Sequence, residues 1–293
     1  MPETTRFAPS PTGLLHLGHA FAAITAHAAA GQGRFLLRIE DLDRGRSRDR
    51  YVAAIFEDLA WLGLTWEEPV LRQSSRYDAY RLALEKLEQL GVLYPCFCSR
   101  REIADEVARA VEAPHAPPLD TSIYPGTCRE LSRFEREQRI AAGERFTIRL
   151  DAQKASAICG ALTFETLSAP SGNGFHGKRQ TVEVKPLLFG DVVLARKDMP
   201  AAYHLAVVVD DAFQGVTLVT RGSDLFTATH LHRVLQSVLG LPPPRYAHHR
   251  LILDDSGRKF SKRNQAVTLR SLRESGVTPA QIRERVGLGL CAP

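Results

Sequence analysis

The chain has 293 residues, of which 44% are apolar and 24% charged, values that are ordinary for a soluble globular protein. No apolar run is long enough to span a bilayer, and the first six residues lack the apolar core of a secretory signal, so we expect a cytoplasmic protein. The net charge of +5 is uneven, because residues 241–293 hold ten Lys or Arg against four Asp or Glu. This basic segment favours a polyanionic partner, although a solvated basic surface would have the same composition.

The segment from Arg6 to His19 predicts a strand, a turn and the start of a helix. Its two prolines and its glycine exclude helix from the turn, and the alanine-rich residues 20–30 then predict a helix. A helix N-terminus after such a turn attracts anions, because its free N–H groups point outward. His16 and His19 share a helix face there and could donate to phosphate oxygens. Ordinary surface or core histidines, or a metal pair, are the alternatives.

A buried strand at residues 34–41 completes a strand–helix–strand unit, which predicts a parallel sheet. Ligands bind such sheets at the carboxyl ends of the strands, where Arg6 and Glu40 would both lie. Two helices are predicted next, over residues 50–64 and 75–90.

Further along, the predicted elements are less regular. Ser99 opens a short predicted helix, residues 113–120 form a loop, and Ser132 opens a further helix. Residues 146–184 are strand-like and Gly-rich, with a turn at 171–174, and strands are predicted at 203–211 and 216–219. A helix at 227–239, a linker at 241–244, a strand at 251–253 and a last helix opened by Thr278 follow.

Two strings, taken together, resemble a known family. His16-Leu17-Gly18-His19, with its Arg-x-x-Pro-Ser-Pro-Thr-Gly lead-in, resembles the HIGH signature of class I aminoacyl-tRNA synthetases of the glutamyl subgroup. Lys259-Phe260-Ser261-Lys262-Arg263 resembles their KMSKS loop, which alone would be read as a solvated charged loop. The resemblance covers about residues 6–270.

The resemblance implies a Rossmann-type α/β fold with an α/β insertion. We expect the two halves of the catalytic domain at residues 1–95 and 201–240, the insertion at 96–200, and a KMSKS-like loop with a short helical segment at 241–293, without an anticodon-binding domain.

The resemblance also implies the site residues. Catalysis is assigned to His16, His19, Lys259 and Lys262, and ATP binding to His16, Gly18, His19 and Lys262. Glutamate would be bound by Arg6, Phe7, Ala8, Pro9, Ser10, Glu40, Tyr203 and Arg221. The chemistry agrees, because a side-chain carboxylate suits the fork of an arginine and an ammonium group suits a carboxylate. Alternatively, Glu40 forms a structural ion pair, Arg221 is a surface charge and Tyr203 belongs to the core.

A zinc knuckle is implied with the ligands Cys96, Cys98, Tyr124 and Cys128, and three thiolates suit a structural Zn²⁺. His115 is an alternative fourth ligand, and reduced cysteines without a metal are the alternative to the zinc site that we expect.

The short chain resembles the glutamyl-Q tRNA(Asp) synthetases. This implies activation of L-glutamate with ATP and Mg²⁺, transfer to the queuosine base at the wobble position of tRNA(Asp), and a monomer. The rival hypotheses are a truncated synthetase charging the tRNA 3′ end, a non-catalytic tRNA-binding relic, and a nucleotidylyltransferase of the same superfold.

Overall fold

The computed structural model describes residues 2–99, 101–104, 123–167, 178–196, 199–253 and 267–288. The strands are β1 Thr4–Phe7, β2 Arg34–Ile39, β3 Glu67–Arg72, β4 Leu93–Cys96, β5 Thr147–Leu150, β6 Thr163–Leu167, β7 Arg179–Glu183, β8 Val193–Arg196, β9 Leu218–Gly222 and β10 Arg245–His249. The helices are α1 Leu17–Ala30, α2 Asp49–Trp61, α3 Tyr77–Gln89, α5 Arg133–Ala141, α6 Ala152–Cys159, α7 Tyr203–Phe213, α8 Ala228–Leu239, α9 Leu269–Glu274 and α10 Pro279–Arg285. Short 3₁₀ turns lie at Gln73–Ser75, Thr127–Arg129 and Ser223–Leu225.

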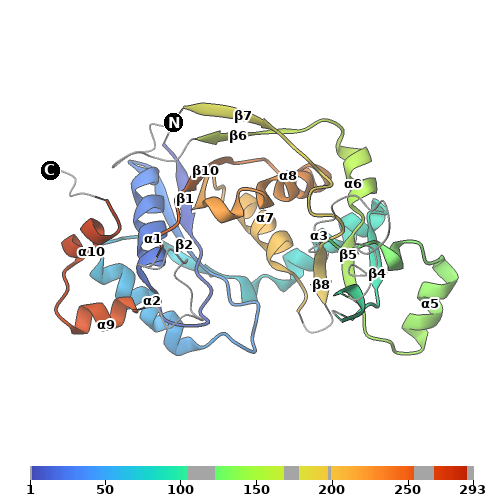
Figure 1. The fold of residues 1–293 in the computed structure, drawn as a ribbon, viewed down its shortest axis with the longest axis horizontal. Coiled ribbons are helices and arrows are strands. Elements are labelled where there is room, and N and C mark those ends of the chain that lie inside the picture. Colours follow the sequence, from blue (N-terminus) through green and yellow to red (C-terminus); the bar gives the residue numbers. More distant parts are fainter. Residues whose placement is uncertain are drawn as a thin grey trace, which may run out of the picture.

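Two half-sheets form the centre of the molecule (Figure 1). One has the order β1-β2-β3 and is parallel; the other has the order β7-β6-β10-β9, parallel except for β7. The amide of Thr217 donates to the carbonyl of Thr4 at 2.9 Å, which brings β9 beside β1. The predicted α/β fold with a parallel sheet is therefore confirmed, and the carboxyl ends of β1, β2 and β9 face one edge.

A third sheet, with the antiparallel order β4-β5-β8, lies at the end of the molecule that also carries α5 (Figure 1). Its strands β5 and β8 fall within the predicted insertion at 96–200, as do β6 and β7, which instead pair into the half-sheet of β10. The domain limits themselves remain a prediction. In the described residues, no helix is long and apolar enough to cross a membrane.

Most predicted helices are present, and some of their ends follow the sequence, although Thr227 makes no side-chain cap hydrogen bond at the start of α8. Gly31 ends α1 with φ 55°, a backbone angle that favours glycine. Ser132 and Thr278 each form a reciprocal capping box, with Glu135 and Gln281 respectively. Ser75 does not cap α3, because it lies in a 3₁₀ turn that precedes the helix. The predicted loop at 113–120 and the turn at 171–174 lie outside the described residues.

Two strand predictions are wrong. Residues 203–211 form helix α7, not a strand. Val207 and Val208 are buried, and so are the two acids that follow, which accept from Arg6 and Arg76. Residues 251–253 form no named strand, and in the part of the chain that the structure describes β10 is the strand that follows α8. Short apolar runs suit a buried helix as well as a strand, and only the tertiary contacts separate the two. Helices α6 and α9 were not predicted.

The C-terminal helices hold α1 in position. Leu269, Leu272 and Ile282 join the cluster of buried side chains formed around α1, β2 and α2. The amide of Leu269 donates to the carbonyl of Leu15 at 2.8 Å, and Thr268 forms a β-bridge with His16. The start of α1 is thereby fixed against both the sheet and the C-terminal segment.

Asp58, on α2, supplies a test of this C-terminal contact. It is fully buried, its carboxylate lies 3.6 Å from Arg273 of α9, and its oxygens have no hydrogen-bond partner in the described residues. Burial raises the pKa of Asp58 to about 6, against the opposing effect of Arg273. A raised carboxyl pKa means that the folded state binds the proton more tightly, so stability falls as pH rises from about 4 to 6. Relative to Asp58→Asn, we expect the wild-type free energy of unfolding to fall by about 2 kcal/mol between pH 4 and 7 in urea titrations.

The neighbouring variant Glu57→Gln is the control for this measurement. Glu57 is half exposed and pairs with Arg270 and Arg273 at 3.2 Å. The free energy of unfolding of Glu57→Gln relative to wild type should change by less than about 0.5 kcal/mol between pH 4 and 7. If the free energy of unfolding of Asp58→Asn relative to wild type also stays constant between pH 4 and 7, the pKa of Asp58 is not raised by folding.

Candidate active site

A cavity of about 400 Å³ opens where the carboxyl ends of β1, β2 and β9 meet the start of α1. Many of its lining residues are those that the sequence singled out: Arg6, Phe7, Ala8, Ser10, His16, Gly18, His19, Glu40, Tyr203 and Arg221. Pro9 is not among the lining residues. Lys259 and Lys262 lie outside the described residues, but Ile252 on one side of that segment lines the cavity and Thr268 on the other side contacts His16.

His16 and His19 cap α1 through their side chains. Nδ1 of His16 accepts from the amide of Gly18 at 3.1 Å, and Nδ1 of His19 accepts from the amide of His16 at 3.2 Å. The ring centroids are 3.8 Å apart, so the predicted shared face is confirmed. Because both Nδ1 atoms accept, the proton of each neutral ring is on Nε2, which is then a donor suited to phosphate oxygens. A side chain on Gly18 would press against the His16 ring at about 3.1 Å.

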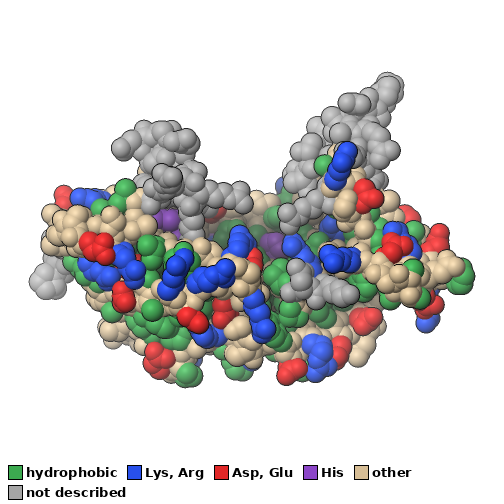
Figure 2. Space-filling model, turned by 90° about the horizontal axis from the view of Figure 1, so that it is seen from below, with side chains coloured by type: hydrophobic (Ala, Val, Ile, Leu, Met, Phe, Trp, Pro, Cys, Tyr) green, Lys and Arg blue, Asp and Glu red, His purple; other side chains and the backbone are tan. Residues whose placement is uncertain are grey.

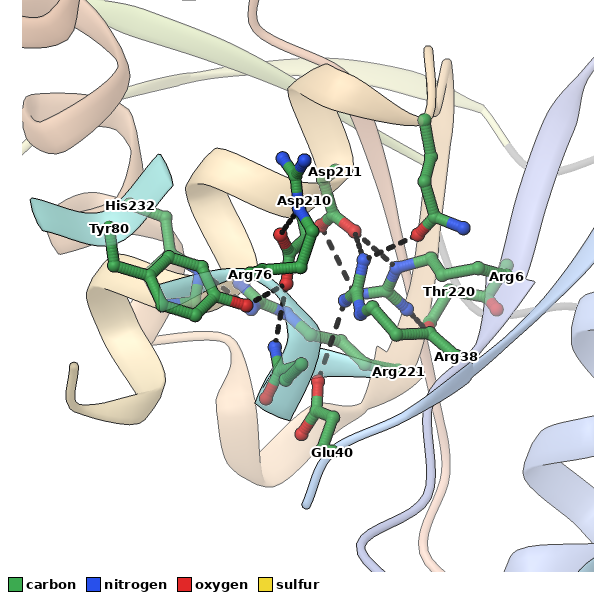
Figure 3. A network of polar contacts seen from close by, with 12 residues as sticks. Arg6, Arg38, Glu40, Arg76, Tyr80, Asp210, Asp211, Thr220, Arg221 and His232 are labelled. Carbon is green, nitrogen blue, oxygen red and sulfur yellow. Dashed lines mark hydrogen bonds and ion pairs between the residues drawn. The ribbon is translucent and has the colours of Figure 1, made fainter. Parts of the chain in front are cut away.

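Asp211 of α7 accepts hydrogen bonds from the guanidinium of Arg6 (Figure 3). Its Nε donates to Asp211 at 3.0 Å and its Nη1 donates to the carbonyl of Thr220 at 3.2 Å. Arg38 donates to the same carboxylate oxygen at 2.7 Å, and its Nη2 lies 3.4 Å from Glu40. Burial alone would raise the pKa of Asp211, but the two guanidinium groups hold it below its usual range. The carboxylate therefore stays ionised and orients both arginines.

Glu40 has both of the roles considered from the sequence. It pairs with Arg38, and it also lines the cavity. Burial raises the pKa of Glu40 despite Arg38 and Arg6. A cation arriving in the cavity would stabilise its ionised form.

Tyr203 and Arg221 also line the cavity. Arg221 is only 5% exposed, which excludes a role as an ordinary surface charge. Burial, and then the charge of Glu40, raise the pKa of Tyr203, so its phenol is a protonated donor.

Several residues of this region were not foreseen. Asp210, next to Asp211, accepts from the Tyr80 hydroxyl at 2.6 Å, from Gln73 at 3.0 Å and from Arg76 at 3.2 Å (Figure 3). This buried group ties α7 to α3, and the strand prediction for 203–211 concealed it. The remaining lining residues include Asp224, which follows β9, His249, which ends β10, and Arg250, which follows β10. Their position at strand ends was the available signal, but it requires the strands to be placed correctly.

Three cysteines gather beside β4. The Sγ atoms of Cys96, Cys98 and Cys128 all lie within 4.8 Å of one another, with 3.4 Å between Cys98 and Cys128. The hydroxyl of Tyr124 lies 3.5 Å from Sγ of Cys98 and accepts from the amide of Cys128 at 2.8 Å. Thiolates around a tetrahedral metal are about 3.8 Å apart, so this cluster has dimensions that could hold a metal ion. His115 lies outside the described residues.

Figure 2 shows a hollowed face with histidine side chains visible in its recesses and Lys and Arg side chains across its middle. Such a surface suits a polyanion, because each cation that contacts a phosphate releases a counterion from it.

Comparison with known proteins gives consistent matches over nearly the whole chain. Residues 3–290 match the family described as "tRNA synthetases class I (E and Q), catalytic domain". The chain is 50% identical to the glutamyl-Q tRNA(Asp) synthetase of Rhodobacter capsulatus, over 97% of this chain and 99% of that protein. It is 43% identical to the glutamyl-Q tRNA(Asp) synthetase of Nocardia farcinica, over 94% of this chain and 81% of that protein.

A solved glutamate tRNA ligase from Elizabethkingia meningosepticum has a similar fold. It superposes with a TM-score of 0.69 at 27% identity, over 90% of this chain and 52% of that chain. The chain thus spans about half the length of this ligase.

Proposed function

The chain belongs to the class I tRNA synthetases of the E and Q type, and we propose that it activates L-glutamate with ATP and transfers the glutamyl group to the queuosine base at the wobble position of tRNA(Asp). The observation that carries the proposal is the 50% identity to a glutamyl-Q tRNA(Asp) synthetase along almost the entire length of both proteins. The site supports it, because its charges match an amino acid with a carboxylate side chain.

Glutamate would lie between Arg221 and Glu40. Arg221 and Arg6 are the cations available to its carboxylates, Tyr203 is a hydrogen-bond donor, and Glu40 is the acceptor for its ammonium group. Ser10 lines the same cavity.

In the activation step, a carboxylate oxygen of glutamate attacks the α-phosphorus of ATP, and the bond to pyrophosphate breaks. Negative charge then increases on the phosphate oxygens, and donors fixed in advance stabilise it. The Nε2–H groups of His16 and His19 at the start of α1 would serve this purpose, and Mg²⁺ would accompany ATP. Lys259 and Lys262 would bind the departing pyrophosphate. A hydroxyl of queuosine then attacks the adenylate carbonyl and releases AMP.

Glutamate-dependent exchange of pyrophosphate into ATP, without tRNA, tests the activation step. We expect exchange in the wild type and a strong decrease in Lys262→Ala. Exchange that appears only with tRNA(Glu) would favour a shortened conventional synthetase, and no exchange under either condition would favour a binding relic. Transfer of labelled glutamate to queuosine-containing tRNA(Asp) with its 3′ nucleotide removed separates base modification from charging of the 3′ end.

The cysteine cluster would hold a structural Zn²⁺ with Cys96, Cys98 and Cys128 as ligands and the Tyr124 hydroxyl as the fourth. Four protein ligands leave no open position, so the ion would stabilise the insertion and take no part in the reaction. No residue of the cavity belongs to this set.

Cys128→Ser should lose the bound zinc. We expect about one zinc per wild-type chain by elemental analysis and almost none in the variant. The free energy of unfolding should fall by about 3 kcal/mol, since metal binding to the folded state adds to its stability. Cys159→Ser is the matched control, because Cys159 lies outside the cluster and contacts the Val234 carbonyl at 3.7 Å. Equal zinc content in both variants would contradict the assignment.

A further inference from the structure

Every nitrogen of the Arg221 guanidinium contacts an uncharged acceptor. Nε donates to Nε2 of His248 at 3.4 Å, Nη1 donates to Nδ1 of His232 at 3.0 Å, and Nη2 donates to Oγ1 of Thr229. All three acceptors are buried, and the Tyr246 ring lies beneath the guanidinium at 5.2 Å. In the part of the chain that the structure describes, no carboxylate lies within 4.0 Å of Arg221.

The protonation of these histidines follows from their partners. Arginine can only donate, so Nδ1 of His232 must accept and the proton of its neutral ring is on Nε2. That Nε2–H lies 3.0 Å from Nδ1 of His204, which accepts it. Burial first, and then the charge of Arg221, lower the pKa values of His232 and His204, the latter to about 4. Both rings are therefore neutral at pH 7, and His204 fixes the tautomer and orientation of His232.

The two other buried arginines of the site, Arg6 and Arg38, each form ion pairs with carboxylates of the protein. Arg6 and Arg38 share Asp211, and Arg38 also contacts Glu40. Two cations and two anions are thus balanced within the protein (Figure 3). Arg221 lies beside this balanced group, buried and with hydrogen bonds but with no carboxylate partner among the residues that the structure describes. A buried charge is costly unless it is paired, and a carboxylate bound in the cavity would supply such a partner.

The histidine cage of Arg221 consists of His232, His248 and Thr229, and His204 contacts His232. We propose that this cage determines the specificity of the site for a carboxylate side chain over a carboxamide. The cage positions the guanidinium through neutral acceptors, so its charge is left for the substrate. Glutamate carries a net charge of −1 and balances Arg221, whereas glutamine carries none. This inference rests on the proposed binding of glutamate by Arg221.

The contacts also leave room for the ligand. A guanidinium has five N–H groups, and the cage occupies three. The two others belong to Nη1 and Nη2, the pair that binds a carboxylate in a fork. His232 and its cage partners are positioning residues, because they act on the substrate through Arg221.

Two variants at one position test the proposal. The side-chain oxygen of asparagine lies near the place of histidine Nδ1, so His232→Asn keeps a neutral acceptor for Arg221. His232→Asp has the same shape but brings a carboxylate to the guanidinium. We expect His232→Asp to raise the KM for glutamate about 100-fold with a smaller change in kcat, since it replaces a charge-assisted contact of the substrate. His232→Asn should lose no more than about tenfold and keep its preference for glutamate.

The decisive measurement is the ratio of kcat/KM for glutamate to that for glutamine in pyrophosphate exchange. The ratio should fall by at least about tenfold in His232→Asp and stay within about threefold of wild type in His232→Asn. Equal ratios in the two variants, both of them folded by circular dichroism and thermal melting, would overturn the cage proposal. If His232→Asp does not fold, calorimetric titration of glutamate and glutamine against His248→Glu, with the neutral His248→Gln as its control, takes its place, and equal selectivity in these two variants overturns the proposal as well. Failure of the wild type to exchange with glutamate would instead refute the proposed function.

Discussion

Arg221→Ala is expected to lower kcat/KM for glutamate by about 10³-fold in pyrophosphate exchange. Arg221 is buried, it lines the cavity, and it carries the one unbalanced charge among the three buried arginines described there. Removing it takes away the counterion of a bound carboxylate, and an unpaired carboxylate in a buried site is costly. The KM for ATP should change by less than about threefold, because the His16 and His19 side chains lie on another element.

Arg221→Lys separates charge from shape in this experiment. Lysine keeps the positive charge but cannot form a fork or reach all three cage acceptors, so we expect it to recover only part of the loss, within about 10²-fold of wild type. If Arg221→Ala retains wild-type exchange, the glutamate site lies elsewhere. If it loses ATP binding to the same extent, the effect is structural.

Asp211→Asn is expected to lower the free energy of unfolding by about 3 to 5 kcal/mol, measured by urea titration at pH 7. This carboxylate accepts from both Arg6 and Arg38, each of them buried, at 3.0 and 2.7 Å. Removing its charge leaves two buried cations with Glu40 as their nearest remaining anion. Arg6 also loses the contact that orients it toward the cavity, so the KM for glutamate should rise as well.

The pH dependence of Asp211 has the opposite sign to that of Asp58. Its pKa is depressed in the folded state, so its contribution is fully present above about pH 4 and is lost as pH falls through the lower, folded value. Glu137→Gln is the control, since this exposed residue pairs with Arg133 on the surface of α5 and should contribute less than about 0.5 kcal/mol. Equal stability of Asp211→Asn and wild type at pH 7 would show that water or another anion replaces the carboxylate.

Local rules of the sequence predicted the strand–helix–strand unit at the start of the chain well, although they missed strands β3 and β4. The turn before α1, the helix and its glycine stop, and the parallel partner β2 all depend on residues close together in the chain. The same is true of the capping boxes at Ser132 and Thr278, where one side chain and its third neighbour satisfy free amides. Short apolar runs cannot be assigned in this way, and α7 was taken for a strand because the unbroken apolar run at residues 205–209 shows no helical period in the sequence.

What the sequence determined by itself is the chemical content of the site: two histidines at a helix start, an arginine and a glutamate at strand ends, and three cysteines at metal-ligand spacing. What only the tertiary structure decided is which charges are balanced. Asp211 lies 205 residues from Arg6, and His232 reaches Arg221 from a separate helix. Charge balance depends on distance and burial through the whole fold, and sequence spacing carries neither, so the neutral cage of Arg221 became visible only when β9, α7 and α8 were brought together.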